Sequence, residues 1–392
     1  MSGRGRGGSL GPALFWGAVG TLGYTYVAFP AAVFVRGVVG HRPHQTGAGA
    51  PRVTVIVAAH NEAEVIGSKL DNLLAVDYPC DRFEVIVASD GSDDGTNEVV
   101  AGFAERGVRL LALPRVGKAT ALNEAVAAAT GEIVVFSDAN TLYAPDAIRA
   151  LVRPFADPQV GGVAGDQRYV RDSTAAASAT GELRYWDFDR LLKIGESRAG
   201  HVISATGAIY AVRRGLVDHV PDGVTDDFFV STGVIAHGKR LVFAPDAVAY
   251  EPVAATSKVE LGRKVRIITR GLRAVAARRA LLDPRRHGFY AVQLFSHKVL
   301  RRLMAVPLIS VAVSSPLLWR RGRLYRAATV AQVAFYTAAG LGLRRKTTSP
   351  PPGPAGRVLA LPAYFVLVNA ACLRAVWNLL RGTRIDRWEP QR

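Results

Sequence analysis

Polar side chains follow several of the apolar runs in the middle of the chain. Asp138 and Asn140 come at the end of one such run, which reads Ile-Val-Val-Phe-Ser. On an extended strand end, side chains two residues apart point to the same side, and their oxygens can bind a hard divalent cation. An Asp-x-Asn triplet also occurs in ordinary turns. Because this one follows a predicted buried strand, we expect Asp138 and Asn140 to bind a metal and a diphosphate.

Lys118 follows Gly117 and opens a stretch with helical spacing. A lysine beside a helix N-terminus suits a phosphate, because its charge adds to the free backbone donors of the first turn. The spacing of a Walker phosphate loop is absent. An ordinary solvated lysine is the competing interpretation.

Asp226 and Asp227 follow Thr225 and precede a second helical stretch. A threonine or aspartate before a helix is an expected cap. Only one of the two carboxylates is needed for capping, which leaves the other free for acid or base chemistry.

The elements that must position these residues alternate between strands and helices. This alternation predicts a mostly parallel α/β sheet with helices on both faces, in which polar groups at the strand ends face a ligand crevice. The predicted strands are Val53 to Ala59, Phe83 to Ser89, Val108 to Leu113 and Glu132 to Asp138. The predicted helices are Asn61 to Val76, Thr96 to Arg106, Lys118 to Ala129 and Pro145 to Phe155.

Long uncharged stretches lie at both ends of the chain. Gly7 to Val35 exceeds the roughly 20 residues that cross a bilayer as a helix, and it is too long for a typical cleaved signal peptide. Leu303 to Trp319, Ala327 to Leu343 and Val358 to Leu373 are shorter and bounded by arginines, and one of them could be re-entrant or interfacial. We expect an anchor at 1–50, a catalytic domain at 51–256, a basic interfacial helical region at 257–302 and membrane segments at 303–392.

The charge distribution favours a membrane surface over nucleic acid. The formal net charge of the 392-residue chain is +17, yet residues 53–256 hold 28 acidic and 18 basic residues. The excess of basic residues therefore adjoins the apolar stretches, where anionic lipid headgroups would meet it. Two cysteines are too few for a disulfide framework, which favours a reducing compartment.

Four motifs occur in a fixed order in the predicted sheet: Ala-His-Asn-Glu at 59–62, Ser-Asp-Gly-Ser-Asp-Asp-Gly-Thr at 89–96, Gly-Lys-Ala-Thr-Ala-Leu-Asn at 117–123 and Phe-Ser-Asp-Ala-Asn at 136–140. In this order they resemble the family 2 glycosyltransferases. The resemblance implies a GT-A fold, a nucleotide-diphosphate sugar donor, Mg²⁺ or Mn²⁺, and inverting transfer.

The resemblance also implies roles for single residues. Asp90 matches the aspartate that holds the nucleoside, Asn61 and Glu62 lie in the first nucleotide-contacting loop, and Lys118 falls near the nucleotide. Gly207, with Ala208, is similar to the small-residue strand that lets the donor sugar approach. Asp138 and Asn140 match the Asp-x-Asp metal motif, but Asn140 replaces the usual second carboxylate.

The membrane-bound members that make cellulose, hyaluronan and poly-N-acetylglucosamine are similar in two further places. Thr225-Asp226-Asp227 resembles their Thr-Glu-Asp motif, which makes Asp227 the expected catalytic base. Their Gln-x-x-Arg-Trp motif is reduced here to Arg266, which implies diphosphate binding without the tryptophan that lines the acceptor site.

The sequence as a whole predicts a multi-pass enzyme of the plasma membrane with a cytoplasmic catalytic domain. We expect it to transfer a sugar, from a UDP-sugar, to a glycan acceptor as polysaccharide synthases do, with no nucleic-acid partner. A single-sugar glycolipid transferase and a catalytically inactive membrane scaffold are the alternatives.

Overall fold

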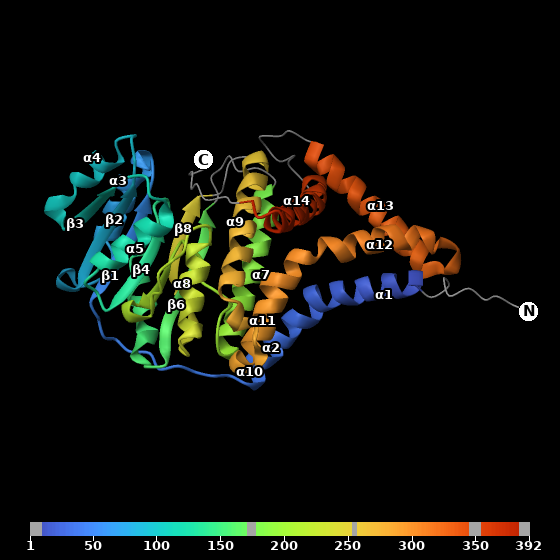
Figure 1. Ribbon diagram of the computed structural model, residues 1–392, viewed down its shortest axis with the longest axis horizontal. Coiled ribbons are helices and arrows are strands. Elements are labelled where there is room, and N and C mark those ends of the chain that lie inside the picture. The colour runs from blue at the N-terminus through green and yellow to red at the C-terminus, as the bar shows by residue number, and fades with distance from the viewer. Residues whose placement is uncertain (1–9, 171–177, 253–256, 345–353, 384–392) are drawn as a thin grey trace, which may run out of the picture.

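The computed structural model describes residues 10–170, 178–252, 257–344 and 354–383. Its centre is an eight-stranded sheet with the order β3-β2-β1-β4-β7-β6-β8-β5 (Figure 1). The strands are β1 (Val53–Ala59), β2 (Phe83–Asp90), β3 (Val108–Leu113), β4 (Ile133–Asp138), β5 (Leu142–Tyr143), β6 (Val160–Val170), β7 (Tyr210–Arg213) and β8 (Arg240–Pro252).

The first four strands run parallel, as the sequence predicts. Val53 of β1 lies opposite Phe83 of β2 and Ile133 of β4, so these three strands end at the same edge of the sheet. Their side chains are aliphatic on both faces because both faces are covered by helices. β7 then runs antiparallel to β4 and β6. The carboxyl ends of β1, β2 and β4 therefore form one crevice edge.

Helices cover both faces of the sheet, and each face has its own hydrophobic core. One core includes Ile66 of α3 and Ile148 of α6, and the other includes Leu122 of α5 and Phe228 of α8. The helices of this region are α3 (Ala63–Leu74), α4 (Thr96–Ala101), α5 (Lys118–Ala128), α6 (Ala147–Val152) and α8 (Asp226–Ala236).

Boundaries of three predicted helices are wrong. The helix expected from Asn61 begins at Ala63, because Asn61 has a φ of 54°, which is left-handed. The helix expected to reach Arg106 stops at Ala101 and is followed by a separate 3-10 turn. Pro145 precedes α6 instead of opening it, and the helix becomes 3-10 at Arg153, where Pro154 lacks a backbone donor.

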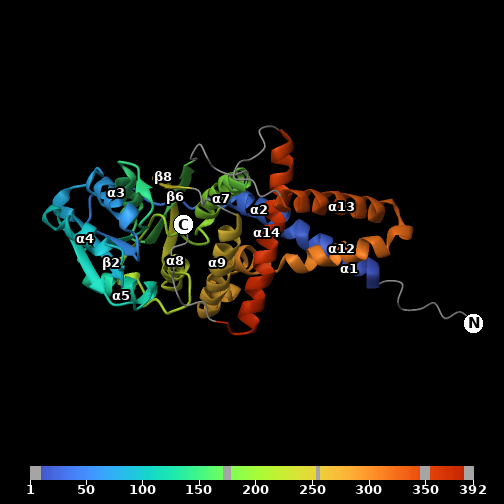
Figure 2. The same ribbon diagram turned by 90° about the horizontal axis from the view of Figure 1, so that it is seen from above.

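The remaining helices lie on one side of the sheet. Figure 1 shows α7 and α9 beside β6 and β8, with α1, α12 and α13 extending away as an arm. Figure 2, turned by 90°, shows that α14 runs across the direction of this arm. These helices are α1 (Leu10–Gly23), α2 (Phe29–Val39), α7 (Ser178–Ala199), α9 (Ser257–Ala277), α10 (Pro284–His287), α11 (Phe289–Leu294), α12 (Ala305–Leu317), α13 (Arg323–Arg344) and α14 (Pro354–Leu380).

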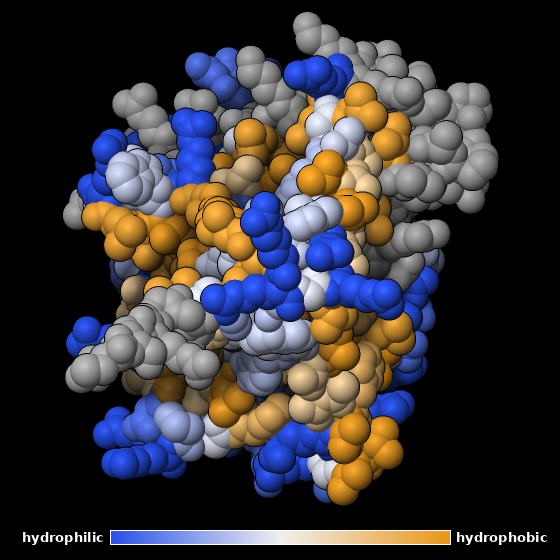
Figure 3. Space-filling model, turned by 90° about the vertical axis from the view of Figure 1, so that its right-hand side faces the viewer, coloured by the Kyte–Doolittle hydropathy of each residue, from blue (hydrophilic) through white to orange (hydrophobic). Residues whose placement is uncertain are grey.

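Two helical segments of the described chain are long and apolar enough to cross a bilayer, Leu10–Val39 and Leu359–Leu380. A third crossing is possible if Phe289–Leu303 and Ala305–Leu317, which meet at a 50° bend, form one broken span. α13 contains the predicted stretch Ala327 to Leu343 but is not among these candidates. The outer end of the arm carries exposed apolar side chains interspersed with charged ones (Figure 3). Such a surface is typical of contact with a membrane.

Candidate active site

Asp138, at the end of β4, lies very close to the backbone at Gly207. A Cβ atom added to Gly207 would lie 2.7 Å from Oδ2 of Asp138. Only glycine therefore allows the two to approach in this way. The Asp138 side chain is 38% exposed, so its carboxylate faces the crevice instead of the core. The structure thus brings together Asp138 and Gly207, which are separated by 69 positions in the sequence.

Glu251 of β8 is a residue of this site that the sequence analysis missed. Its Oε1 lies 3.5 Å from Nδ2 of Asn140, and its other oxygen accepts a hydrogen bond from Gln167. Burial, and then the charge of Asp138, raise the pKa of Glu251 to about 7. A lone glutamate near the end of an apolar strand was the only available signal. The Glu251 carboxylate therefore lies beside Asn140, the residue that replaces the second carboxylate of the Asp-x-Asp motif.

Lys118 joins the two acidic parts of the site. Its Nζ lies 3.2 Å from Oδ1 of Asp138 and 3.2 Å from Oδ2 of Asp226. Burial disfavours the ammonium, but Asp226 and Asp138 outweigh that effect and raise the pKa of Lys118. The side chain is only 16% exposed, so it is not an ordinary solvated lysine.

Asp227 lies in the first turn of α8, next to Asp226. Burial, followed by the charge of Asp226, raises the pKa of Asp227, while a 2.7 Å hydrogen bond from the backbone N–H of Phe228 opposes the shift. Thr225 occupies the N-cap position but forms no side-chain capping hydrogen bond. The simple capping interpretation of this motif is therefore wrong for Thr225.

Tyr210 of β7 is a second residue that the sequence analysis missed. Its ring stacks on Phe136 at a centroid distance of 4.8 Å. Its hydroxyl is buried and, within the described residues, has no hydrogen-bond partner. Burial, with the charges of Asp226 and Asp227, raises the pKa of Tyr210. A neutral O–H group therefore lies close to the two carboxylates of α8.

Asp90, at the end of β2, holds the loop that leads into α5. Its Oδ1 accepts hydrogen bonds of 2.7 Å from the backbone N–H groups of Val116 and Gly117. Its Oδ2 accepts one of 2.8 Å from Arg115, another residue that the motifs did not mark. Because Asp90 is 1% exposed, its described contacts are internal. It fixes the backbone that carries Lys118.

Asn61 and Glu62 connect the ends of β1 and β2. Nδ2 of Asn61 donates to Oδ1 of Asp93 over 2.8 Å, and the backbone N–H of Asp93 donates back to Oδ1 of Asn61 over 3.0 Å. The backbone N–H of Glu62 donates to Oγ1 of Thr96 over 2.8 Å. The two loops therefore form one hydrogen-bonded rim beside the crevice.

Lys69 of α3 supports the Asp138 loop from behind. Its Nζ donates a 2.7 Å hydrogen bond to the backbone carbonyl of Thr141 and lies 3.9 Å from the Tyr143 ring centroid. Burial lowers the pKa of Lys69 to about 7, although the charge of Asp138 acts in the opposite direction. Nothing in the sequence around Lys69 marked it as part of the site.

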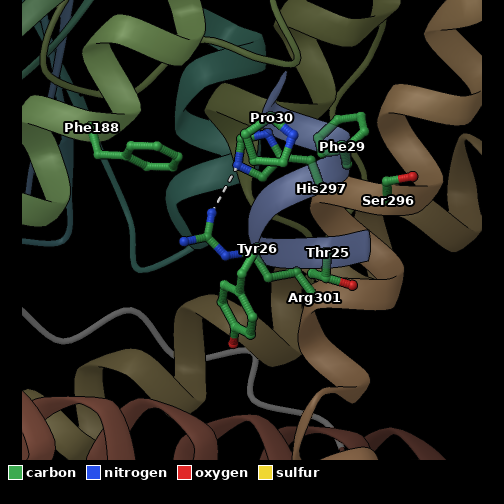
Figure 4. Close-up of a pocket in the computed structure, with 8 residues that line it drawn as sticks. All are labelled: Thr25, Tyr26, Phe29, Pro30, Phe188, Ser296, His297 and Arg301. Carbon is green, nitrogen blue, oxygen red and sulfur yellow. Dashed lines mark hydrogen bonds between the residues drawn. The ribbon is translucent and has the colours of Figure 1, made fainter. Parts of the chain in front are cut away.

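Two predictions from the sequence concern residues farther from this cluster. Arg266 lies on α9, a helix that packs against α8 and α14. Tyr185, Trp186 and Phe188 are aromatic residues whose types suit stacking on an acceptor sugar or, equally, packing in a core or interface. The side chains of Tyr185 and Trp186 fall outside those that the structure describes, and Phe188 lines a small recess between α2, α7 and residues 296–301 (Figure 4).

The fold and this cluster define a class of protein. A mostly parallel sheet with an acidic turn after β4 and a carboxylate pair opening α8 is the GT-A arrangement of nucleotide-sugar transferases. Residues 51–273 match the family described as "Glycosyltransferase like family 2", and the chain belongs to that family. It is therefore a glycosyltransferase, as the four ordered motifs predicted.

Similarity to known proteins extends this result. The chain is 28% identical over 211 residues to the poly-beta-1,6-N-acetyl-D-glucosamine synthase of Staphylococcus aureus, and 26% identical over 251 residues to that of Staphylococcus epidermidis. It spans about half the length of these curated relatives, 50% and 59%. Among solved structures it is similar to the mannosyltransferase PcManGT from Pyrobaculum calidifontis, in complex with GDP-Man and Mn²⁺. The TM-score is 0.72 with 28% identity, covering 95% of this chain and 100% of that one.

Proposed function

We propose that this chain transfers a sugar from a nucleotide-diphosphate donor to an acceptor at the membrane, with inversion at the anomeric carbon. The observation that supports this most directly is the cluster formed by Lys118, Asp138 and Asp226. It joins the start of α5, the end of β4 and the start of α8 within 3.2 Å contacts. Asp227 lies directly beside that cluster.

The donor end of the site fits Mg²⁺ or Mn²⁺. Asp138, Asn140 and Glu251 offer oxygen ligands, which these hard cations prefer. Gly207 leaves space at the Asp138 carboxylate that a Cβ atom would fill. The bound ion would neutralise negative charge on the donor diphosphate. Lys118, close to Asp138, would contribute a second positive charge there.

At the reacting centre the chain's own residues would move one proton. Asp227 would accept the proton of the acceptor hydroxyl, whose oxygen forms a bond to the anomeric carbon. The bond from that carbon to the diphosphate oxygen breaks, and the nucleoside diphosphate leaves with the electron pair. A single displacement of this kind inverts the configuration. Asp226, paired with Lys118, would position the lysine.

Several donors and acceptors are candidates for this reaction. The sequence favoured a UDP-sugar, whereas the similar structure from Pyrobaculum calidifontis binds GDP-Man, so both nucleotides are candidates. Similarity to the poly-N-acetylglucosamine synthases supports a glycan acceptor and chain elongation. The missing glutamine and tryptophan around Arg266 support transfer of a single sugar to a lipid. We place the catalytic domain on the cytoplasmic side of the plasma membrane.

The test uses the full chain in detergent with Mn²⁺ or Mg²⁺, a panel of UDP- and GDP-sugars, and membrane lipid extract as acceptor. Release of one nucleoside diphosphate, abolished by Asp138→Ala and retained by Asp222→Ala, supports the proposal. The matched control removes a carboxylate from an exposed turn before α8. A ladder of products would indicate elongation and one glycolipid would indicate single transfer. No release from any donor would instead favour an inactive scaffold.

A further inference from the structure

The segment that leads from the catalytic domain into α12 carries three cations on two adjacent turns. It consists of η8 (Phe295–Val299) and η9 (Leu300–Leu303), just before the 50° bend of the candidate broken span. Lys298, Arg301 and Arg302 are all partly buried there. Ionisable residues in such a segment are costly, and they commonly mark a functional site. The two turns present these cations in two directions.

One direction is accounted for by internal contacts. Arg301 Nη1 lies 3.3 Å from Nε2 of His297, whose Nδ1 lies 3.2 Å from the buried Glu196 (Figure 4). This pair lines the recess beside Tyr26 and Phe188. The recess holds about 20 Å³, which is room for about one water molecule. His297 and Arg301 therefore have a structural role and leave no space for a larger ligand.

The other direction faces the first turn of α8. The Lys298 ammonium lies 5.7 Å from the Phe228 ring centroid, and its charge interacts with that of Asp227. Within the described part of the chain, Lys298 has no hydrogen-bond or ion-pair partner. Arg302 and Thr225 both approach Gly271 of α9. A Cβ atom added to Gly271 would lie 3.7 Å from Nη1 of Arg302 and 3.6 Å from Oγ1 of Thr225. Lys298 and Arg302 thus flank the motif that contains the candidate base.

Lys298 and Lys118 have different neighbours. Lys118 contacts Asp138 and Asp226 at 3.2 Å, whereas the Lys298 ammonium lies over the ring of Phe228. The donor diphosphate already has a cation in Lys118. Asp189 and Asp227 act on the half-buried Lys298 ammonium without forming an ion pair with it in the described part of the chain, and Arg302 adds a further positive charge, so an anionic ligand beside these two cations would stabilise them.

We propose that Lys298 and Arg302 bind the phosphate of a membrane-anchored acceptor in which a sugar is attached to a lipid phosphate, so that the sugar supplies the reacting hydroxyl. This inference rests on the proposed function, because it names the acceptor of that site. A lipid source is favoured over free phosphate by the apolar side chains exposed on the same segment. Phe295 and Leu303 on this segment are 47% and 38% exposed, Val292 on α11 just before it is 40% exposed, and all three would contact the hydrocarbon chain.

The experiment measures lipid binding to the full wild-type chain with no donor present, so that no turnover occurs. Nanodiscs of phosphatidylcholine carry either a long-chain isoprenyl monophosphate or the isoprenol of equal length, and phosphatidic acid is compared with diacylglycerol in parallel. We expect preferential binding of at least one phosphate lipid over its neutral counterpart. We expect Lys298→Gln with Arg302→Gln to weaken it by about tenfold or more, as for loss of charge-assisted hydrogen bonds. Excess inorganic phosphate should not displace the lipid.

The matched control is Arg285→Gln with Arg286→Gln, which removes the same charge from exposed positions on α10. An equal loss of lipid binding in this control would show general membrane attraction and overturn the proposal. Equal affinity for the phosphate lipid and its neutral counterpart would also overturn it. So would displacement of the bound lipid by inorganic phosphate. Mn²⁺-dependent nucleotide binding checks folding, and Lys298→Arg with Arg302→Lys should restore lipid binding if charge is what matters. Failure to restore it in a folded protein would also contradict the site. Because no donor is needed, a scaffold without transferase activity would still show this lipid binding.

Discussion

Lys118 determines the charge balance of the site at the scale of single residues. Its ammonium contacts both Asp138, which we assign to the donor, and Asp226, which neighbours the proposed base Asp227. Without it, carboxylates that are close together would repel one another and take up protons. Burial and the neighbouring Asp226 raise the pKa of Asp227, a change that makes a carboxylate a stronger base.

Asp227→Asn should abolish transfer while donor binding persists. Loss of a general base reduces the rate by about 10² to 10⁴, and the amide keeps the shape of the side chain. Because the deprotonated carboxylate is the active form and its pKa is raised, wild-type kcat/KM should rise with pH, with a midpoint above the ordinary value of 3.8. The residual activity of Asp227→Asn should not show this rise of kcat/KM with pH. Activity near that of the wild type would remove Asp227 from this role.

Asn140→Asp and Glu251→Gln test the metal ligands in opposite directions. The first adds a carboxylate and should tighten Mn²⁺ binding, whereas the second removes the charge that lies 3.5 Å from Asn140 and should weaken it. We expect each substitution to change the Kd for Mn²⁺ by about tenfold, because each adds or removes one charged ligand. Calorimetric Mn²⁺ titration with bound nucleoside diphosphate measures both. If Glu251→Gln binds Mn²⁺ as tightly as the wild type, Glu251 is not a ligand.

At the scale of elements, the site depends on close backbone approaches. The approach before β7 places Gly207 against Asp138, and the crossing of α2 with α7 places Gly37 against Gly195. In both places a side chain would meet atoms that cannot move freely. Two alanine substitutions therefore separate the geometry of the site from the attachment of the N-terminal helix.

Gly207→Ala should weaken metal and donor binding more than it weakens folding. The added methyl group would lie 2.7 Å from Oδ2 of Asp138, and the partly exposed carboxylate would have to rotate away. Equilibrium nucleotide binding with Mn²⁺ and thermal unfolding are measured together. Gly215→Ala, where nothing lies within 4 Å, is the control and should leave both unchanged. Equal donor affinity in the two variants would contradict this prediction.

Gly37→Ala should destabilise the packing of α2 on α7. The new Cβ atom would lie 2.7 Å from the carbonyl oxygen of Gly195, and overpacking of this kind costs about 1–3 kcal/mol. Thermal unfolding in detergent should show a lower Tm. Gly20→Ala on α1 has no atom within 4 Å and should unfold at or slightly above the wild-type temperature. A Tm for Gly37→Ala equal to that of Gly20→Ala would contradict the packing.

At the scale of the whole molecule, the sheet and the arm face different environments. The sheet region is rich in acidic residues, whereas the helices at both ends expose apolar side chains and adjoin arginines. α1, α12 and α13 point away from the sheet (Figure 1), and Lys298 of η8, just before α12, lies 5.7 Å from the ring of Phe228 in α8. If the arm enters a membrane, we expect the candidate base to lie close to the membrane surface.

Thiol labelling of intact cells tests this placement. Cys80 is exposed in the sheet region, and Cys372 is buried. If the arm crosses the bilayer, Gly322→Cys, between α12 and α13, should react with a membrane-impermeant maleimide in intact cells. Cys80 should react only after lysis. Reaction of Gly322→Cys only after lysis would mean that the bent pair is re-entrant and that both ends of the arm lie on one side.

The sequence by itself determined the class of the fold and the family, and it marked most residues of the candidate site. Uninterrupted aliphatic runs specify buried parallel strands, and short polar motifs at their ends are local in the chain, so both can be recognised without coordinates. The tertiary structure alone decided the partners that come from distant segments. Glu251 meets Asn140, Lys69 meets Thr141, and Lys298 lies over the ring of Phe228, only because β8, α3 and η8 come from distant parts of the chain to lie near β4 and α8. No local pattern encodes such contacts, since they depend on how whole elements are placed against one another.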